Sequence, residues 1–493
     1  MSSSNAVRLA YKKETTYGET PAGVKAFRAI QEITYTAVKA GTQGNSITIE
    51  YADTVTAGSE TVVVTGNAIL INIEDGVSTA TQVKAAFDLS AAAVALATAV
   101  ITGTASNAQE TQAALALQTG AGEFKTVRFI SEELSGSPET TESQQIRTDR
   151  MSSGQVVTGL TVGGNHSFEL AKESALEDFL ESAMYNAWVT STIVNGTFEI
   201  DIDLKKIIRV TGSFVTEGVV VGDFITLSNF VNAANNTIVM VTSVSALELT
   251  YAGPTGMVDA ASEAASYQIA DKLSIGTTKK SLSIEKAFTD LTTKAINYRG
   301  MIAASMELNI EYGSLISGSF GFSGNDYVTA DAASEFMTFE HYITEAATTN
   351  TLNGSVDMPF LATNVTGAWL TDSFCIQSLN LNLSNNLTTQ TCIGNIAPED
   401  YTPGTAQIEA SLSSYLKDGN WDLLARKLSQ DSFGLGFMVK NTGGWYGFFV
   451  PALQVSFDDP SSQGANQDVS MDMSGQAKVG SNGESAITLY RSA

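Results

Sequence analysis

Apolar and polar residues alternate along several short stretches of this chain. Leu282 and Ile284 alternate with serine and glutamate, and the same alternation recurs at 306–311, 379–383 and 453–458. Because successive side chains of a β-strand point to opposite faces, each stretch predicts a strand with one apolar and one polar face. Glycine, threonine and serine are frequent and there are only 8 prolines, which is typical of antiparallel β proteins. We therefore predict a mainly β fold whose sheets have a core side and a side that faces water or a lumen.

Two other stretches have helical spacing. Between Glu173 and Tyr185 the apolar residues fall at i, i+3, i+4, i+7 and i+8, and they are Leu176, Phe179, Leu180, Ala183 and Met184. Ser174 is a possible cap of this helix. A shorter stripe lies between Asn420 and Leu428 and consists of Trp421, Leu424 and Leu428. Both stripes predict a helix that packs on a sheet rather than a cofactor site.

The two predicted helices occupy the same place in two series of elements. In each series a strand precedes the helix and a set of strands follows it, and the series end in similar triplets at 322–324 and 473–475. The order of elements, rather than sequence identity, predicts an internal duplication of one module made of a β-sheet and a helix. The first module is discontinuous and comprises 123–197 and 271–330, and the second comprises 331–493.

Two segments interrupt the first half of the chain. Residues 31–122 are rich in alanine, threonine and valine and predict strands and a helix near Thr81–Phe87. Because the similar stretches Phe27–Ile30 and Val127–Ile130 flank them, we predict an inserted α/β-type decoration domain beside a strand. Residues 198–270 predict several short strands, at 224–227 and 238–241 among others, and so an inserted small β-barrel.

Glycine pairs and aromatic residues add local predictions. The pairs Gly163-Gly164 and Gly443-Gly444 predict turns, since neither belongs to a phosphate-binding glycine motif. The aromatic run 445–449 predicts a buried hairpin rather than a platform for sugars.

Charge excludes several classes of protein. The chain has 52 acidic and 27 basic residues and a net charge of −25, and it has no cluster of lysine and arginine. A protein that grips duplex DNA needs a basic footprint, so we predict no specific binding of nucleic acid. No apolar run is long enough for a membrane-spanning helix, and Met1–Asn5 do not begin a signal peptide, so we expect neither membrane insertion nor export by that route.

Residues suited to catalysis or metal binding are few. The only cysteines are Cys375 and Cys392 and the only histidines are His166 and His341, and none has the spacing of a zinc site or of a catalytic triad. Asp201 and Asp203 do not begin a calcium-binding loop, and nothing singles out a pair of carboxylates for glycoside chemistry. We therefore expect no catalytic residue, no metal and no cofactor.

Several strings, taken in order, resemble the tail tube proteins, or major tail proteins, of long-tailed (siphovirus-type) bacteriophages. The resemblance covers 1–30, 123–200 and 271–493, and the 198–270 insert is also similar, whereas 31–122 resembles a domain of various phage structural proteins. The strings that carry it lie at 8–21, 146–150, 164–170, 179–184, 280–286, 298–301 and 317–322.

The resemblance implies a structural virion protein and no enzyme. Tail tube modules are β-sandwiches or barrels with one flanking helix, and their inner sheets join around rings that stack into a hollow tube for genome ejection into the host. Relatives with one module form hexameric rings, so a duplicated chain implies a homotrimer with pseudo-sixfold symmetry. Six modules of four strands give about 24 strands and a lumen roughly 35–40 Å wide, which admits a duplex roughly 20 Å across.

The resemblance also implies partners and a location. The partners are other copies of the chain and the tape measure, terminator and distal tail proteins, in a virion tail assembled in the host cytoplasm, and DNA passes through without specific binding. Residues 1–30 are then an N-terminal arm, which we expect to become ordered only against a neighbouring ring. Both inserts are expected to project outward from the tube.

An acidic lumen wall would keep DNA from sticking, because each lysine or arginine that neutralises a phosphate adds to binding. The polar faces of the alternating strands supply five candidate lumen-facing acids, which are Glu285, Glu307, Glu311, Glu409 and Asp458. An extracellular β-rich adhesin or polysaccharide-degrading protein remains the alternative function. That alternative explains the β content and the acidity, but it predicts export and gives the duplication no role.

Overall fold

Strands dominate the part of the chain that the structure describes, so the prediction of a mainly β fold is confirmed. The computed structural model describes residues 6–122, 124–146, 149, 151, 154–291, 294–330, 342–343, 351–364, 370–371, 376–417, 421, 431–457, 459–460, 468–481 and 483–492. Most of the predicted helix at 420–428 lies outside these residues, as do His341, Cys375 and Asp458. None of the described helices is long and apolar enough to cross a membrane.

The chain forms two compact units. One comprises Met1–Arg128, Ser281–Met301 and Gly324–Ala346, and the other comprises Phe129–Lys280, Ile302–Ser323 and Ala347–Ala493.

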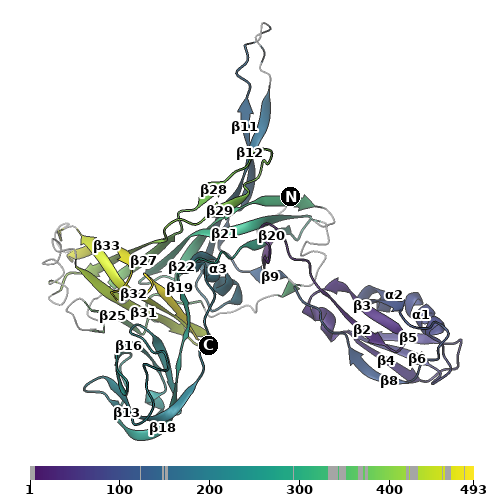
Figure 1. The fold of residues 1–493 in the computed structure, drawn as a ribbon, viewed down its shortest axis with the longest axis horizontal. Helices are drawn as coiled ribbons and strands as arrows, with labels where there is room; N and C mark the ends of the chain where they lie inside the picture. The colour runs from purple at the N-terminus through teal and green to yellow at the C-terminus, as the bar shows by residue number, and fades with distance from the viewer. Residues whose placement is uncertain are drawn as a thin grey trace. The chain divides into compact units, whose positions relative to one another are not determined.

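The first unit contains an α/β body. A three-stranded sheet consists of β2 (Lys25–Ile30), β3 (Ile33–Ala40) and β7 (Ala97–Ile101), and a four-stranded sheet has the order β5-β6-β4-β8, with β4 at Thr48–Asp53, β5 at Thr61–Thr65, β6 at Ala68–Ile73 and β8 at Gln112–Ala116. Helices α1 (Ala80–Leu89) and α2 (Ala91–Leu96) contact both sheets (Figure 1). Helix α1 begins at a capping box in which Thr79 and Gln82 bond reciprocally, and it buries Val83 and Phe87.

The stretch before residue 31 belongs to this body. Ala26 and Ile30 lie in its hydrophobic core, whose buried members all fall between Ala26 and Leu117. Phe27 also exchanges backbone hydrogen bonds with Gln118. The compact body therefore starts before residue 31, and Phe27–Ile30 does not share a sheet with the later stretch that it resembles.

A third sheet of this unit contains part of the predicted arm. Strand β1 (Val7–Lys13) pairs with β9 (Phe124–Val127) and with β20 (Leu282–Phe288), and β20 pairs with the first part of β21 (Lys294–Glu311). The same part of β21 pairs with β23 (Asp326–Ala330), and the short β24 (Tyr342–Ile343) pairs with β9. The expectation that the arm is ordered only against a neighbouring ring is therefore wrong for β1, since Leu9, Ala10 and Tyr11 are buried in a sheet of the same unit.

The second unit is built around one long antiparallel sheet. Its strands follow the order β12-β22-β21-β27-β30-β33-β32, where the second part of β21 takes part. The bounds are β12 at Gln155–Glu169, β22 at Ser317–Gly324, β27 at Ile376–Ser384, β30 at Gln407–Tyr415, β33 at Ser470–Lys478 and β32 at Gly444–Phe457.

Shorter strands extend this sheet at both ends. At one end β12 pairs with β10 (Ser131–Glu132) and β11 (Ser135–Glu142). At the other end β32 pairs with β31 (Ser432–Asn441) and with β34 (Thr488–Arg491). Beyond these, β25 (Phe360–Thr363) pairs with β31, β26 (Leu370–Thr371) pairs with β25, and β19 (Asp271–Ser274) pairs with β34. Strands β28 (Thr388–Gln390) and β29 (Asp400–Thr402) form a separate hairpin.

Helix α3 (Ser174–Met184) confirms the helix predicted from its apolar stripe. All five stripe residues are buried, and Phe179 makes edge-to-face contacts with Phe320 and Phe322 of β22 at ring distances of 5.7 and 5.3 Å. Ser174 is the first helical residue and not the cap, because the N-cap is Glu173.

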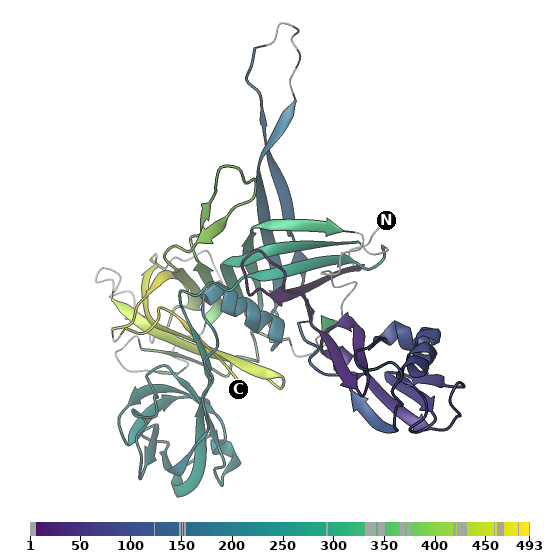
Figure 2. The ribbon, with the colours of Figure 1, turned by 45° about the vertical axis from the view of Figure 1, so that its right-hand side comes forward.

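Between α3 and β19 the chain forms a closed six-stranded barrel with the order β13-β14-β17-β16-β15-β18 (Figure 2). Its strands are β13 (Val194–Asp201), β14 (Lys206–Arg209), β15 (Phe224–Ser228), β16 (Ile238–Val244), β17 (Glu248–Ala252) and β18 (Ala260–Ile269). The strands predicted at 224–227 and 238–241 lie within β15 and β16.

The two glycine pairs behave differently. Gly443 lies in the tight turn between β31 and β32, as predicted, and the aromatic run beyond it is buried in that hairpin. The turn predicted at Gly163-Gly164 is wrong, because both residues lie inside β12. A Cβ on Gly164 would lie 2.2 Å from the carbonyl oxygen of Glu133 and one on Gly163 would lie 2.6 Å from that of Phe322, so these glycines permit a close approach of backbones.

Candidate functional site

One face of the long sheet in the second unit is polar. Along β21 the apolar side chains of Met306, Leu308 and Ile310 are buried, and Glu307 and Glu311 point to the opposite side. The neighbouring strands follow the same alternation, so the core lies on one side of the sheet and polar groups on the other. We call this side the polar face.

Strand register aligns the polar face into rows. The first row runs across four strands through Glu307, Asn382, Glu409 and Gln476. The second row consists of Asn309, Asn380, Ser411 and Ser474, and the third of Glu311, Ser378, Ser413 and Asp472. These residues lie between 307 and 476 in the sequence, and only the pairing of strands brings them side by side.

Hydrogen bonds between neighbouring side chains order part of this face. The side-chain amides of Asn380 and Asn309 donate to Glu307 Oε1 at 2.9 and 3.2 Å. Ser413 donates to Asp472 Oδ1 at 2.6 Å. A shallow hollow of about 380 Å³ lies over β27, β30, β33 and β32, and serines and Asn380 are prominent in its lining. Hydroxyl and amide groups of this kind hold water rather than apolar ligands.

The polar face carries an excess of negative charge. Its three rows contain four carboxylates, those of Glu307, Glu311, Glu409 and Asp472. Lys478, at the end of β33, is the one cation at the described same-face positions of β22, β21, β27, β30, β33 and β32. No group of three or more potential metal ligands occurs among the described residues. The arrangement repels polyanions and offers phosphate a single basic side chain, that of Lys478.

The structure brings together three of the five candidate acids. Glu307 and Glu409 flank Asn382 in one row, and Glu311 lies two positions further along β21 on the same face. Glu307 is half-buried, whereas Glu311 and Glu409 are exposed. Glu285 lies elsewhere, fully buried in β20 of the first unit, where both sides of the strand are covered at 282–285. Asp458 lies outside the described residues.

Sequence reasoning missed Asp472. It alternates with the buried Met471 and Met473, which is the same period-two signal that singled out the other acids. Its partner Ser413 and its place in the third row depend on strand pairing across 59 residues, which the alternation does not reveal.

Comparison with models of protein families identifies a family that this chain matches. A family model described as phage tail tube protein matches residues 4–477, which is nearly the whole chain. No curated protein sequence matches the chain.

Proposed function

The chain belongs to the phage tail tube protein family, and on this premise we propose that its copies form stacked rings, the hollow tail tube of a siphovirus-type phage. Family membership makes it a structural protein of the virion tail that assembles with itself and with other tail proteins. In the proposal the tube is the channel for genome ejection, and the tape measure, terminator and distal tail proteins are its partners. The family match argues against the adhesin or polysaccharide-degrading alternative.

The polar face is the observation that carries the proposal. A duplex that has to slide needs a wall that is wetted and does not bind phosphate. Carboxylates supply this, since like charges repel over about 8–10 Å at physiological salt. We assign Glu307, Glu311 and Glu409 to the lumen wall and add Asp472. Glu285, which is buried in its own unit, is not part of this wall. Asp458 lies outside the described residues and stays a prediction.

Strand pairing supports the proposed duplication. The pairings β12–β22, β22–β21 and β21–β20 have counterparts in β30–β33, β33–β32 and β32–β31. In addition, β23 pairs with β21 as β34 pairs with β32, and β1 pairs with β20 as β25 pairs with β31. We retain modules at 123–197 with 271–330 and at 331–493, with the inserts at 31–122 and 198–270, and assign β1 to the first module. Three copies then supply six modules in a homotrimeric ring.

One pairing joins the two proposed modules. Residues 305–311 of β21 pair with 378–384 of β27 in an antiparallel register. If the duplication holds, the counterpart of this junction joins β32 of one copy to β10 and β11 of the next. Closure of the ring then covers both sheet edges, which would otherwise invite uncontrolled pairing.

Exposed apolar side chains at two hairpin tips suit the stacking of rings. Ile146 and Met151 lie between β11 and β12, and Ile393 and Ile396 lie between β28 and β29, and all four are at least half exposed. Apolar groups at the tips of extended hairpins gain stability when another surface covers them. We assign that surface to the neighbouring ring.

Electron microscopy of the purified protein tests the proposal. Concentrated protein is expected to form tubes or stacked rings, and averaging is expected to give threefold symmetry with six similar lobes. Monomers at every concentration would contradict the assembly, and six chains in each ring would contradict the duplication.

A further inference from the structure

The six-stranded barrel packs against a part of the chain far from its own insertion point. It follows α3 in sequence, yet its outer side contacts the β31–β32 hairpin, which begins at Ser432, far beyond the end of β18 at Ile269. One buried cluster joins Phe224, Ile238, Met240 and Ala252 of the barrel to a set from the later strands, Ala362, Met438, Trp445, Phe449 and Tyr490.

Glycines accommodate the large side chains of this interface. A Cβ on Gly436 would lie 2.2 Å from Met240 Sδ, and one on Gly447 would lie 3.0 Å from the Phe224 ring. In the reverse direction, a Cβ on Gly222 would lie 2.3 Å from the Phe449 ring. Large groups on each side therefore fill spaces left by glycine on the other, which is the close complementarity of a fixed contact rather than a loose one.

A buried carboxylate lies beside the cluster. Asp223, which is fully buried, accepts hydrogen bonds from the Tyr490 hydroxyl at 3.1 Å and from the Val220 N–H at 3.0 Å. Lys272 Nζ lies 3.5 Å from the same Oδ1 that Tyr490 contacts. These contacts join the barrel, β19 and the C-terminal strand β34, and each bond depends on the barrel keeping its position.

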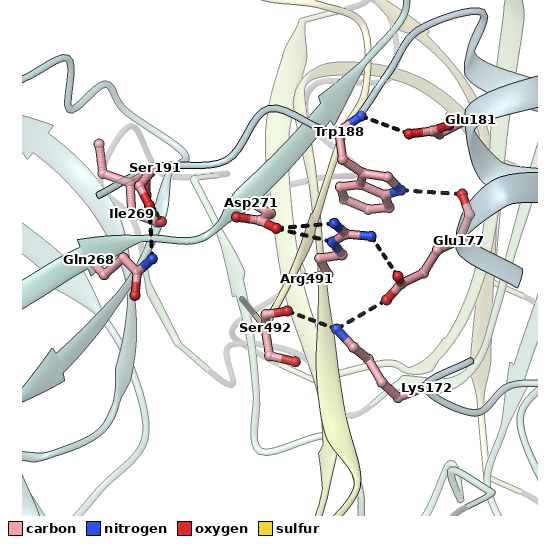
Figure 3. A network of polar contacts seen from close by, with 10 residues as sticks. All are labelled: Lys172, Glu177, Glu181, Trp188, Ser191, Gln268, Ile269, Asp271, Arg491 and Ser492. Carbon is pink, nitrogen blue, oxygen red and sulfur yellow. Dashed lines mark hydrogen bonds and ion pairs between the residues drawn. The ribbon is translucent and has the colours of Figure 1, made fainter. Parts of the chain in front are cut away.

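The two chain segments that lead into and out of the barrel are also tied together. Val189 and Lys272 exchange backbone hydrogen bonds of 2.9 and 3.0 Å. Ser191 and Gln268 add side-chain bonds, from the Ser191 hydroxyl to Ile269 O and from Gln268 Nε2 to Ser191 O (Figure 3). We call these two paired segments, 189–191 and 268–272, the barrel neck. Their pairing removes the flexibility that two separate linkers would have.

The C-terminal strand closes the arrangement (Figure 3). Arg491 donates two hydrogen bonds of 3.2 Å to Asp271 and one of 2.5 Å to Glu177 on α3, and its guanidinium lies over the Trp188 ring at 4.6 Å. Lys172 donates to the backbone oxygen of Ser492 and pairs with Glu177 at 3.0 Å. The end of the chain thus connects helix α3, the barrel neck and the β31–β32 side of the sheet.

We propose that the barrel is an intramolecular staple that locks the α3 side of the long sheet to its β31–β32 side, with β34 as the closing strand. Within the long sheet the two sides are linked through the β21–β27 pairing, and paired strands twist over a range of angles. If the chain functions as proposed above, the staple fixes the angle between the two modules of one chain before assembly. Each copy then enters the ring as a preformed pair of modules, which favours rings of three chains.

Moving side-chain volume from one side of the interface to the other tests the staple in the full chain. The Gly436→Val variant is expected to push Met240 out of its space and to raise hydrogen exchange at least tenfold in 220–227 and 433–450. Exchange in the barrel core around Phe198 and Tyr267 should stay unchanged. The double variant Gly436→Val with Met240→Ala, which removes about as many side-chain atoms as it adds, is expected to restore protection. Lys440→Val, at an exposed position of the same strand, is the matched control.

The same variants are then followed through assembly by electron microscopy. Gly436→Val is expected to form tubes at least fivefold more slowly than wild type, and the double variant at close to the wild-type rate. If Gly436→Val fails to fold, Met240→Ala alone loosens the interface by a cavity and replaces it in both measurements. Unchanged exchange in the loosened variant, or loosening with wild-type assembly, would overturn the staple. Absence of tubes from wild-type protein would instead reject the proposed function, and the exchange data would still decide whether the barrel is locked.

Discussion

Arg491 of strand β34 donates a hydrogen bond of 2.5 Å to Glu177 of helix α3, which precedes it by 314 residues. The side chains are 19% and 13% exposed, so the pair is shielded from water and its loss leaves carboxylates uncompensated. Arg491→Ala is expected to lower the free energy of unfolding by about 3 kcal/mol, and Arg491→Lys to recover part of that because it keeps the charge without the planar fork. Urea unfolding followed by circular dichroism measures both.

A surface ion pair provides the control. Lys84 and Asp88 pair at i, i+4 on helix α1, where both side chains are about a third exposed or more. Lys84→Ala should cost about 0–0.5 kcal/mol. Equal losses in the Arg491 and Lys84 variants would show that the C-terminal contact is no stronger than an ordinary surface pair.

Asp223 predicts a dependence of stability on pH. Burial raises the pKa of the Asp223 carboxyl, and this outweighs Lys272 and the hydrogen bonds that favour its charged form. Because the folded-state pKa lies above the unfolded one, protonation stabilises the folded chain, and that stabilisation is lost as pH rises through the folded-state pKa. Relative to Asp223→Asn, the wild type should gain stability as pH falls from 7 toward 4. Chemical denaturation of both proteins across this range measures the difference, and the opposite slope would mean that the charged form is the favoured one.

The barrel contains a largely buried ion pair. Arg209, whose side chain is 4% exposed, donates to Glu217, and its guanidinium lies over the Phe214 ring at 4.8 Å. Tyr267 donates to the same carboxylate. Burial alone would raise the pKa of Glu217, but the hydrogen bonds from Arg209 and Tyr267 hold it below the usual value.

Arg209→Ala is expected to destabilise the barrel by about 3–4 kcal/mol, since it removes the cation that compensates the Glu217 carboxylate. Tyr267→Phe removes a single hydrogen bond to a charged group and should cost about 1.5–2 kcal/mol. Hydrogen exchange in 194–269 reports the effect locally. Similar small losses in both variants would show that the guanidinium contributes packing alone.

Periodicity predicted those parts of the structure that depend on one strand or one helix. The stripe of α3 and the shared face of Glu307 and Glu311 on β21 follow from periods of 3.6 and 2, which hold whatever surrounds the element. Glu285 shows the limit, because alternation says which side chains share a face and not that both faces of β20 are covered. Gly163-Gly164 shows another limit. A glycine pair signals unusual backbone geometry, but only the neighbouring backbones at Glu133 and Phe322 decide between a turn and a close approach.

Pairings between distant segments could not be predicted in the same way. The row from Glu307 to Gln476 and the contact of the barrel with β31–β32 depend on which apolar surfaces meet in three dimensions. Many pairings bury similar areas, so composition does not select among them. The β2 strand is a related case. It resembles the stretch at 127–130, but its buried residues Ala26 and Ile30 complete the core of the α/β body.

The α/β body is expected to be dispensable for tube formation. Val24 and Ala121 exchange backbone hydrogen bonds of 2.8 and 3.1 Å, so the two ends of the body lie side by side. Replacement of 25–120 by a short glycine-serine linker should leave β1 and β9 paired and should still give tubes in electron microscopy. We expect these tubes to be thinner than wild-type tubes, because we propose that the body projects outward. A shortened protein that folds but never polymerises would instead give the body a role in assembly.

The charge of the polar face predicts how the tube treats DNA. Glu307 and Glu409 lie in one row of the polar face, on either side of Asn382. Replacing both glutamates with lysine converts part of a row that repels DNA into one that binds phosphate. The fold should tolerate this, because Asn380 and Asn309, which now donate to Glu307, can turn their amide oxygens toward an ammonium group. The matched Glu307→Gln and Glu409→Gln pair removes the charge without reversing it, and Glu199→Lys adds a cation on the exposed side of the barrel.

Tubes of all three variants should form. Short duplex DNA should bind inside the lysine tubes with a steep dependence on salt, weakly or not at all inside the glutamine tubes, and as in wild type for Glu199→Lys. In phage that carry the lysine pair, delivery of the genome should slow, since each neutralised phosphate adds a step of counterion exchange to sliding. Equal DNA retention and equal delivery rates in the lysine and glutamine variants would show that the polar face does not line the path of the DNA.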